Sequence, residues 1–470
     1  MDSFISLVTN INNFVWGPVM LVLLVGTGLY LNVILRFFSF RNWMHAFHCL
    51  WQGREHQSEK GEISPWNALM TALAGDIGTG NIVGVATALA IGGPGALFWM
   101  WLAALLGTAT KYAECLLAVK YRKVDADGHI VGGPFYYIET GMGRQWKWLA
   151  KIFAFFGVGV GLLGIGTFTQ VNGISSAVNN FFDPNNAWTV NLFGRTYSWT
   201  VVIAGVILTV CVALVIIGGL KRISKVAELI VPFMAVLYVI IGILIILFNI
   251  TKVPAALVLI VQSAFGLKAA AGGAIGAMIV AMQKGIARGI FSNEAGLGSA
   301  PIAAAAAHTH EPVRQGLISM TGTFIDTIII CTMTGLAIVI TGAWDMGLEG
   351  VAVTTKAFEL GLPFPNQVCA FILMVCLVFF AFTTILGWDY YSERCLEYLT
   401  GGKKKVVKVY RWIYILAIFI GPYMTVAAVW TIADIFNGLM AIPNLIALVA
   451  LSGVVAAETK DYLTRYKGKD

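Results

Sequence analysis

The chain has few charged residues and no long polar segment. Charged side chains make up 12% of its 470 residues, whereas a typical soluble domain carries about 25%. Hydrophobic residues make up 58% of the chain, and its mean hydropathy is +0.80. This composition excludes an ordinary soluble enzyme and predicts an all-α polytopic membrane protein.

Several motifs of catalysis and cofactor binding are missing. No Gly-x-x-x-x-Gly-Lys-Ser/Thr sequence is present, so coupling to ATP through a P-loop is excluded, and the absence of His-Glu-x-x-His argues against an intramembrane protease. The seven cysteines have no metal-type spacing, which is typical of buried thiols. We therefore expect no enzymatic activity, no organic cofactor and no nucleic-acid partner.

Apolar stretches long enough to cross a bilayer are abundant, and eleven can be delimited. Their approximate limits are 14–37, 65–90, 95–120, 148–181, 198–220, 226–249, 273–305, 314–342, 366–397, 408–432 and 435–457. Residues 1–13 contain no Lys or Arg. That segment therefore lacks the basic start of a signal peptide, and we expect the first stretch to be retained as a span.

The basic residues are unevenly distributed between the two sides of the membrane. With the N-terminus outside, 24 of the 31 Lys and Arg residues lie in or beside the cytoplasmic loops and the C-terminal tail, and four lie in the outer loops. Cytoplasmic loops are enriched in basic residues. We therefore expect a multi-pass membrane protein, with its N-terminus outside, its C-terminus inside and Lys403–Lys405 facing anionic lipid.

Two apolar spans are interrupted near their middle by glycines and polar residues. Gly75–Asn81 (GDIGTGN) interrupts the second span, and Gly289–Gly298 (GIFSNEAGLG) interrupts the seventh. Backbone that leaves a helix inside a membrane is tolerated where protein or a water-filled cavity satisfies it. Close helix packing is an alternative reason for the glycines, but it does not explain the carboxylates and amides beside them.

The breaks lie five spans apart, so they run through the membrane in opposite senses. Paired breaks in two inverted halves are typical of secondary transporters, whose substrates bind at the breaks. We therefore predict an extra N-terminal transmembrane helix (14–37), two inverted five-helix repeats (65–249 and 273–457) and a cytoplasmic tail (458–470). A channel would need a repeated polar lining instead.

Three segments resemble the alanine or glycine:cation symporter family: Gly75–Val85, Gly92–Trp101 and Phe291–Gly296. The resemblance covers about residues 14–457 and implies the leucine-transporter-type fold of two inverted five-helix repeats. It also implies sodium-coupled uptake of alanine, and often glycine, by alternating access across the cytoplasmic (inner) membrane. A proton-coupled amino acid symporter and an amino acid channel remain the alternatives.

An amino acid zwitterion needs separate binding groups for its two charges. Free backbone amides at the start of a half-helix suit the carboxylate, because the helix dipole is positive there. The candidate amides belong to Gly78, Thr79, Gly80 and Asn81. Carbonyls of Phe291 and Ser292, with Asp76 nearby, suit the ammonium group. The alternative for Asp76 is a salt bridge to a basic residue of another span.

Further substrate contacts follow from the resemblance. Gln170, midway along the fourth span, matches the family pattern and is expected to bind the substrate; the alternative is a hydrogen bond between helices. Trp388 and Phe291 are expected to form the lid and wall of a small pocket that favours alanine or glycine. Asn293 completes the set from the second break.

Sodium prefers hard oxygen ligands. Thr383 and Thr384 in the ninth span resemble the hydroxyl pair that caps one sodium in this fold, although adjacent threonines also bond to the preceding helical turn. The remaining ligands are expected to be the carbonyls of Ala74, Ile77 and Phe380. A second sodium is placed near Asp76 and Asn81.

Other polar residues have less specific interpretations. Lys111 and Glu114, three residues apart, are expected to pair near the cytoplasmic end of their helix. Three acids are candidate gates or partners for Lys284 and Arg288: Asp326, Asp389 and Asp434. We expect a monomer or a weak oligomer. The ranking of alanine, glycine and serine, the preferred enantiomer and the number of sodium ions stay open.

Overall fold

The computed structural model describes residues 10–53, 61–125, 128–192, 194–267, 273–424 and 426–467, most of which are helical. The helices of the first half are α2 (Pro18–Ile34), α3 (Phe38–Arg41), α4 (Trp43–Gln52), α5 (Pro65–Asp76), η1 (Gly80–Gly84), α6 (Val85–Gly92), α7 (Gly95–Lys120), α8 (Pro134–Tyr136), η2 (Tyr137–Gly141), η3 (Arg144–Trp146), α9 (Lys147–Leu163), α10 (Phe168–Phe182), α11 (Trp199–Ile216) and α12 (Gly219–Phe248). Those of the second half are η4 (Ile250–Lys252), α13 (Val253–Ala264), α14 (Ala274–Asn293), α15 (Ala300–Ala304), α16 (Pro312–Thr323), η5 (Phe324–Cys331), α17 (Thr332–Thr341), η6 (Ala343–Asp345), α18 (Val351–Gly361), α19 (Asn366–Thr400), α20 (Lys404–Ile420), η7 (Gly421–Tyr423), α21 (Val426–Ala450) and α22 (Ser452–Lys467).

The membrane-spanning helices agree in number with the sequence. Within the described residues, ten helices are long and apolar enough to span, and a bent pair, Pro65–Asp76 with Gly80–Gly92, makes an eleventh. Leaving aside α2, each half contributes five spans. These are α5/α6, α7, α9/α10, α11 and α12, then α14/α15, α16/α17, α19, α20 and α21. The predicted all-α, eleven-span architecture is therefore confirmed.

The last two spans begin and end earlier than the hydropathy pattern suggests. Their observed limits are 404–423 and 426–450, where the sequence predicts 408–432 and 435–457. Pro422 has no amide hydrogen, and the backbone at Met424 is extended, so the helix ends there. Asp434 lies within α21, where its carboxylate pairs with Arg288 of α14.

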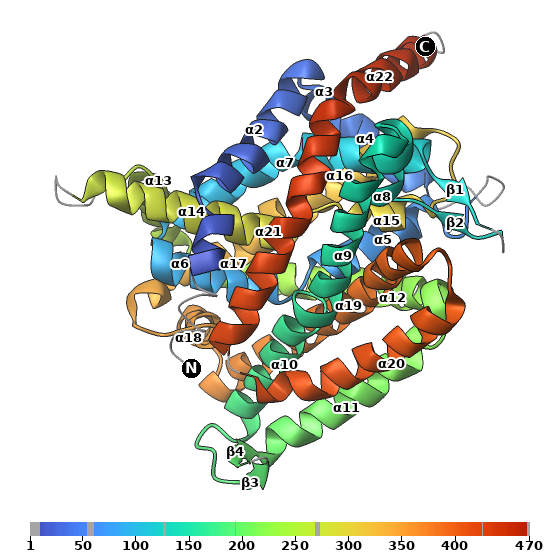
Figure 1. The fold of residues 1–470 in the computed structure, drawn as a ribbon. Helices are drawn as coiled ribbons and strands as arrows, with labels where there is room; N and C mark the ends of the chain where they lie inside the picture. Colours follow the sequence, from blue (N-terminus) through green and yellow to red (C-terminus); the bar gives the residue numbers. More distant parts are fainter. Residues whose placement is uncertain are drawn as a thin grey trace.

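The residues of both breaks are buried inside the bundle, and long helices pass beside them (Figure 1). Helix α7 packs against α14 and α16, and α19 packs against α5, α9 and α10. Helix α12 contacts both α5 and α19, while α21 lies along α9. The breaks in α5/α6 and α14/α15 are therefore enclosed by protein on all sides, as irregular backbone in a membrane requires.

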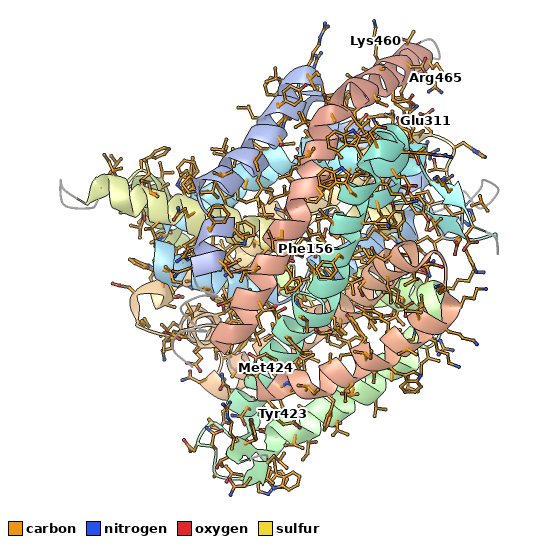
Figure 2. The ribbon with its side chains drawn as sticks, in the orientation of Figure 1. Phe156, Glu311, Tyr423, Met424, Lys460 and Arg465 are labelled. Atoms are coloured by element: carbon orange, nitrogen blue, oxygen red, sulfur yellow. The ribbon has the colours of Figure 1, made fainter. Side chains whose placement is uncertain are left out.

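The bundle has two distinct ends. The antiparallel hairpin of β3 (Thr189–Leu192) and β4 (Arg195–Ser198) lies at one end, and α22 lies at the other (Figure 1). We call these the hairpin end and the α22 end. Figure 2 shows Lys460 and Arg465 at the α22 end and Tyr423 at the hairpin end. A smaller hairpin joins β1 (Lys123–Val124) to β2 (Ile130–Val131).

The surface and the interior have the reverse polarity of a soluble protein. Leu214, Leu229 and Phe248 on α11 and α12 are among many large apolar side chains that are more than half exposed. The interior instead holds buried ionisable side chains, including Asp76, Lys111, Glu114, Glu294 and Asp326. Burying such groups is costly unless they are paired or hydrogen-bonded. Their gathering around the two breaks marks the candidate site.

Candidate functional site

The first break begins where α5 ends. The backbone at Ile77 is extended, and the chain bends by 50° before the next helix begins. Gly78 follows, and a Cβ built there would lie 2.4 Å from the Thr384 hydroxyl and 2.9 Å from Oε1 of Gln170. The missing side chain thus allows α19 and α10 to approach the break closely.

The amides predicted to receive the substrate carboxylate already have acceptors. The Gly78 amide donates to Oδ1 of Asn81 at 2.8 Å, and the Thr79 amide donates to Oε1 of Gln170 at 2.9 Å. Gln170 is itself anchored, because its Nε2 donates to the Ile165 carbonyl at 2.9 Å. Two neutral side-chain oxygens therefore lie where the oxygens of a substrate carboxylate are expected.

The second break begins after Asn293, the last residue of α14. Glu294 has a left-handed backbone with φ of +55°, and Gly296 and Gly298 also have positive φ. The chain resumes as α15 six residues later. Positive φ is disfavoured for residues with a Cβ, so the glycines permit this turn inside the membrane.

The two breaks touch each other. A Cβ on Gly80 would lie 3.1 Å from the Phe291 ring and 3.3 Å from the Ser292 Cα. The predicted residue Gly80 is therefore a neighbour in space of Phe291 and Ser292, which lie more than two hundred positions later in the chain. A small ligand bound between the breaks would contact both helices.

Asp326 of η5 holds the two breaks together. The Asn81 side-chain Nδ2 donates to Oδ1 of Asp326 at 2.6 Å, and the Ser292 hydroxyl lies 3.1 and 2.9 Å from the two carboxylate oxygens. Thr327 donates to Oδ2 at 2.7 Å and accepts from the Asn293 side chain at 3.0 Å. From the sequence, Asp326 is expected only as a candidate gate or as a partner for Lys284 or Arg288. The sequence shows that this carboxylate lies in an apolar span. It does not show that the residue lies on a π-helical turn, a feature common at functional sites.

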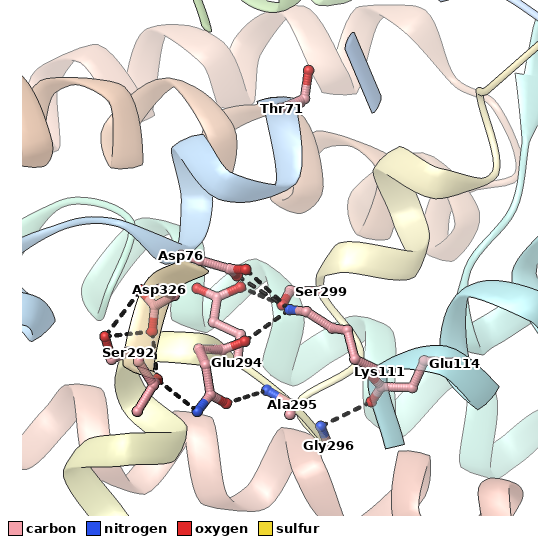
Figure 3. A network of polar contacts seen from close by, with 12 residues as sticks. Thr71, Asp76, Lys111, Glu114, Ser292, Glu294, Ala295, Gly296, Ser299 and Asp326 are labelled. Carbon is pink, nitrogen blue, oxygen red and sulfur yellow. Dashed lines mark hydrogen bonds and ion pairs between the residues drawn. The ribbon is translucent and has the colours of Figure 1, made fainter. Parts of the chain in front are cut away.

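Asp76 forms a salt bridge with Lys111, a basic residue of another span. This is the alternative that the sequence left open for Asp76. The Lys111 ammonium lies 3.2 Å from each carboxylate oxygen of Asp76 and donates to the Asn293 carbonyl at 2.8 Å (Figure 3). The predicted pair of Lys111 with Glu114 is therefore wrong. Glu114 instead points toward the second break, where its carboxylate accepts from the Gly296 amide at 3.0 Å.

Trp388 is fully buried beside the second break. Its indole nitrogen donates to Oε1 of Glu294 at 2.7 Å, and the Ser299 hydroxyl donates to the other carboxylate oxygen. The ring packs edge-on against Tyr391. Trp388 thus supports the turn at Glu294, and its expected role as a pocket wall remains a prediction.

Most of the predicted sodium ligands come together. The Thr384 hydroxyl lies 3.1 Å from the Ile77 carbonyl and 3.1 Å from the Phe380 carbonyl. The Thr383 hydroxyl lies 3.0 Å from the same Phe380 carbonyl. The bonds to Phe380 are the back-bonds expected of helical threonines. The contact with Ile77 is different, because it joins α19 to the broken end of α5.

Ala74 lies on the same contact between helices. It is buried in α5, and a Cβ on Gly387 of α19 would lie 2.9 Å from the Gly75 nitrogen and 3.4 Å from the Ala74 carbonyl carbon. The sequence also places a second sodium at Asp76 and Asn81. These two side chains bind different partners, Lys111 and Asp326, so no shared contact supports that assignment.

A cluster of aromatic and ionic side chains, which we call the lid, packs against Phe291 beside the second break. Arg288 forms a two-pronged ion pair with Asp434 at 2.8 and 2.7 Å, which confirms one predicted partner for this arginine. Its guanidinium lies 4.7 Å from the Trp430 ring centroid, and Trp430 packs on Phe291 at 4.8 Å. A cavity of about 230 Å³, lined by Trp430 and Gly173, lies beside this lid.

The α22 end is closed by backbone contacts. Ile63, just before α5, forms a parallel bridge with Ala307, just after α15. The His308 amide donates to the Ile63 carbonyl at 2.8 Å, and the Arg122 side chain donates to the Ala305 and Ala307 carbonyls at 2.9 and 2.8 Å. The segments flanking the two broken spans are therefore tied together at this end.

Comparison with known proteins identifies the family. The sodium:alanine symporter family model matches residues 1–470. An uncharacterized transporter of Haemophilus influenzae is 55% identical over 98% of this chain and 97% of its own length, and the sodium/alanine symporter AgcS of Methanococcus maripaludis is 46% identical with the same coverage. A crystal structure of MhsT in complex with L-phenylalanine has the same fold, with a TM-score of 0.57, 14% identity, and coverage of 86% of this chain and 99% of that chain. The chain is therefore a multi-pass membrane transporter that belongs to the sodium:alanine symporter family.

Proposed function

We propose that the protein imports alanine and glycine into the cytoplasm together with sodium, by alternating access. The observation that carries the proposal is the position of Gly78. Its backbone amide belongs to the predicted carboxylate site. The side of its Cα that would carry a Cβ lies against the Thr384 hydroxyl of the predicted sodium site. The substrate and ion sites therefore share one short segment of backbone, through which each ligand can change the affinity for the other.

Substrate binding is an exchange of hydrogen bonds at the first break. The substrate carboxylate replaces the side-chain oxygens of Asn81 and Gln170 on the amides of Gly78 and Thr79. Hydrogen bonds to an ionised acceptor are about twice as strong as those between neutral groups. The exchange is therefore favourable for a carboxylate, while the neutral oxygens keep the amides satisfied between transport events.

The ammonium group binds on the side of the second break. The Phe291 ring and the Ser292 Cα approach Gly80 of the first break, and Asp326 lies within hydrogen-bond reach of Ser292 and Asn81. The carbonyls of Phe291 and Ser292 are the acceptors that we propose for the ammonium group. The close approach of Gly80 to the Phe291 ring leaves little room for a substrate side chain. Alanine and glycine fit this limit, because larger side chains overpack such a pocket.

Sodium binding stabilises the geometry that binds the substrate. A sodium ion among the oxygens of Ile77, Phe380 and Thr384 fastens the end of α5 to α19, next to Gly78. The ion therefore favours the backbone conformation in which the Gly78 and Thr79 amides face the substrate. By thermodynamic linkage, the substrate raises the affinity for sodium by the same factor.

Alternating access follows from two closures at opposite ends. We propose that the lid around the Arg288–Asp434 ion pair is the closure toward the hairpin end, and that the contact of Ile63 with Ala307 is the closure at the α22 end. With the N-terminus outside, the hairpin end faces outward and the α22 end faces the cytoplasm. Movement between two inverted halves, residues 65–249 and 273–457, opens these closures in turn.

Proton coupling is the second candidate, and one observation favours it. Asp389 of α19 is buried, and both its carboxylate oxygens lack a hydrogen-bond partner within the described residues. A buried carboxylate without a donor is costly when ionised, so this group suits proton binding.

Transport into proteoliposomes distinguishes these functions. We expect radiolabelled L-alanine to accumulate under an inward sodium gradient and excess glycine to compete. Accumulation under a proton gradient alone would change the coupling ion. Failure under both gradients, with protein that remains monodisperse, would contradict the proposed substrate class.

A further inference from the structure

Lys111 is a full charge held inside the membrane by two broken helices. Its side chain is 1% exposed, and its ammonium lies between the Asp76 carboxylate at the end of α5 and the Asn293 carbonyl at the end of α14. The three groups come from three spans and meet where both breaks begin (Figure 3). A carboxylate and a carbonyl are also the hard oxygen ligands that a sodium ion would use.

The other buried acids of this region are satisfied differently. Glu114 accepts from the Gly296 amide, Glu294 from the Trp388 indole, and Asp326 from Asn81 and neighbouring hydroxyls. Among these four carboxylates in the described residues, Asp76 alone has a protein cation in ion-pair contact. An unpaired buried charge is strongly unfavourable, so the Lys111 ammonium offsets the cost of a negative charge on Asp76.

We propose that Lys111 is a resident counter-ion that occupies a cation position between Asp76 and the Asn293 carbonyl, so that Asp76 binds neither sodium nor the substrate ammonium. The inference rests on the proposed sodium-coupled function. Because the lysine is tethered to α7, this cation stays with the protein while sodium crosses. The neutral pair then ties α5 to α14 throughout the cycle.

Counting the sodium ions bound by purified protein tests the proposal. Equilibrium binding of radioactive sodium, without amino acid, is measured for wild type, Asp76→Asn, Lys111→Ala and the double variant. We expect wild type and Asp76→Asn to bind the same number of ions, although the unpaired lysine weakens the apparent sodium affinity of Asp76→Asn by about tenfold. Lys111→Ala frees the position and is expected to bind one additional sodium, which the double variant loses again.

A matched control comes from the same helix. Lys120 pairs with Glu458 at 2.6 Å, but both side chains are partly exposed. Lys120→Ala removes an equal charge and is expected to leave both the number of sodium ions and their affinity unchanged, since exposed pairs contribute little.

Two results would overturn the proposal. Loss of one bound sodium in Asp76→Asn would make Asp76 a sodium ligand, and an unchanged number in folded Lys111→Ala would show that its ammonium occupies no cation site. If Lys111→Ala fails to fold, Asp76→Asn and the double variant still decide, because the proposal requires both to bind as many ions as wild type. Sodium binding without alanine uptake would refute the proposed substrate while leaving this count valid. A wild type that binds no sodium would overturn both.

Discussion

Replacing Thr384 by valine tests the sodium site through one hydroxyl. Valine keeps the branched shape of threonine but removes the oxygen that lies 3.1 Å from both the Ile77 and Phe380 carbonyls. The side chain is buried, so water cannot replace the lost ligand. An interaction with a charged partner contributes about 1.5–3 kcal/mol, and about 1.4 kcal/mol corresponds to a tenfold change in affinity. We therefore expect sodium affinity to fall by roughly ten- to hundredfold.

Sodium-dependent binding of radiolabelled L-alanine to the purified protein measures this change. Thr384→Ser retains the hydroxyl and is expected to stay within about threefold of wild type. Thr341→Val is a matched control, because Thr341 also bonds to its preceding turn, at 2.7 Å from the Ala337 carbonyl, but lies in α17 outside the proposed sodium site. Unchanged sodium dependence in a folded Thr384→Val protein would refute the assignment of this hydroxyl to sodium.

The remaining predictions concern the substrate site and the lid. Gly78→Ala brings a Cβ to 2.4 Å from the Thr384 hydroxyl. We expect this change to abolish sodium-dependent alanine binding, because relieving the clash must move either the backbone of the first break or the Thr384 hydroxyl, and the proposed sites need both. Binding with normal affinity would contradict the shared backbone segment. Gln170→Glu places a charged acceptor against the Thr79 amide and should weaken alanine affinity by more than about tenfold, measured by competition binding; tighter binding would show that Gln170 does not stand in for the substrate carboxylate. Asp434→Asn leaves Arg288 without its counter-charge and should slow uptake by about tenfold while sodium affinity stays within about threefold; equal losses in both would place the ion pair in the sodium site.

The architecture of the core could be predicted from the sequence because the signals were local. Polar residues and glycines inside apolar runs located both breaks, at Gly75–Asn81 and Gly289–Gly298, and the observed breaks fall within these segments. The chain leaves helical geometry at Ile77 and again at Glu294. Backbone hydrogen bonds must be satisfied inside a membrane, so polar residues and glycines within an apolar run indicate clearly where a helix is broken.

The partners of the buried charges could not be predicted, because they depend on packing between distant spans. Sequence spacing suggested that Lys111 pairs with Glu114, whereas the helix rotation turns the lysine toward Asp76 of a neighbouring span. Asp434 looked like a residue near the end of a span, yet Arg288 neutralises it inside α21. In both cases a charge that sequence alone would place near water is compensated by a residue far away in the chain.

Asp326 illustrates a further limit. A single acid in an apolar span suggested a gate, but its central position depends on the π-helical turn of η5 and on hydrogen bonds from Asn81 and Ser292. A one-residue change in helical register alters which side chains face inward. Periodicity in the sequence does not reveal that shift.

Reciprocal coupling is the most direct test of the account. Proteoliposomes with equal sodium concentrations on both sides are given an inward gradient of L-alanine, and the uptake of radioactive sodium is followed. Two ligands that share the Gly78 segment must drive each other, so the account predicts transient accumulation of sodium above its external concentration. Alanine entry without sodium accumulation would contradict symport and its shared binding segment.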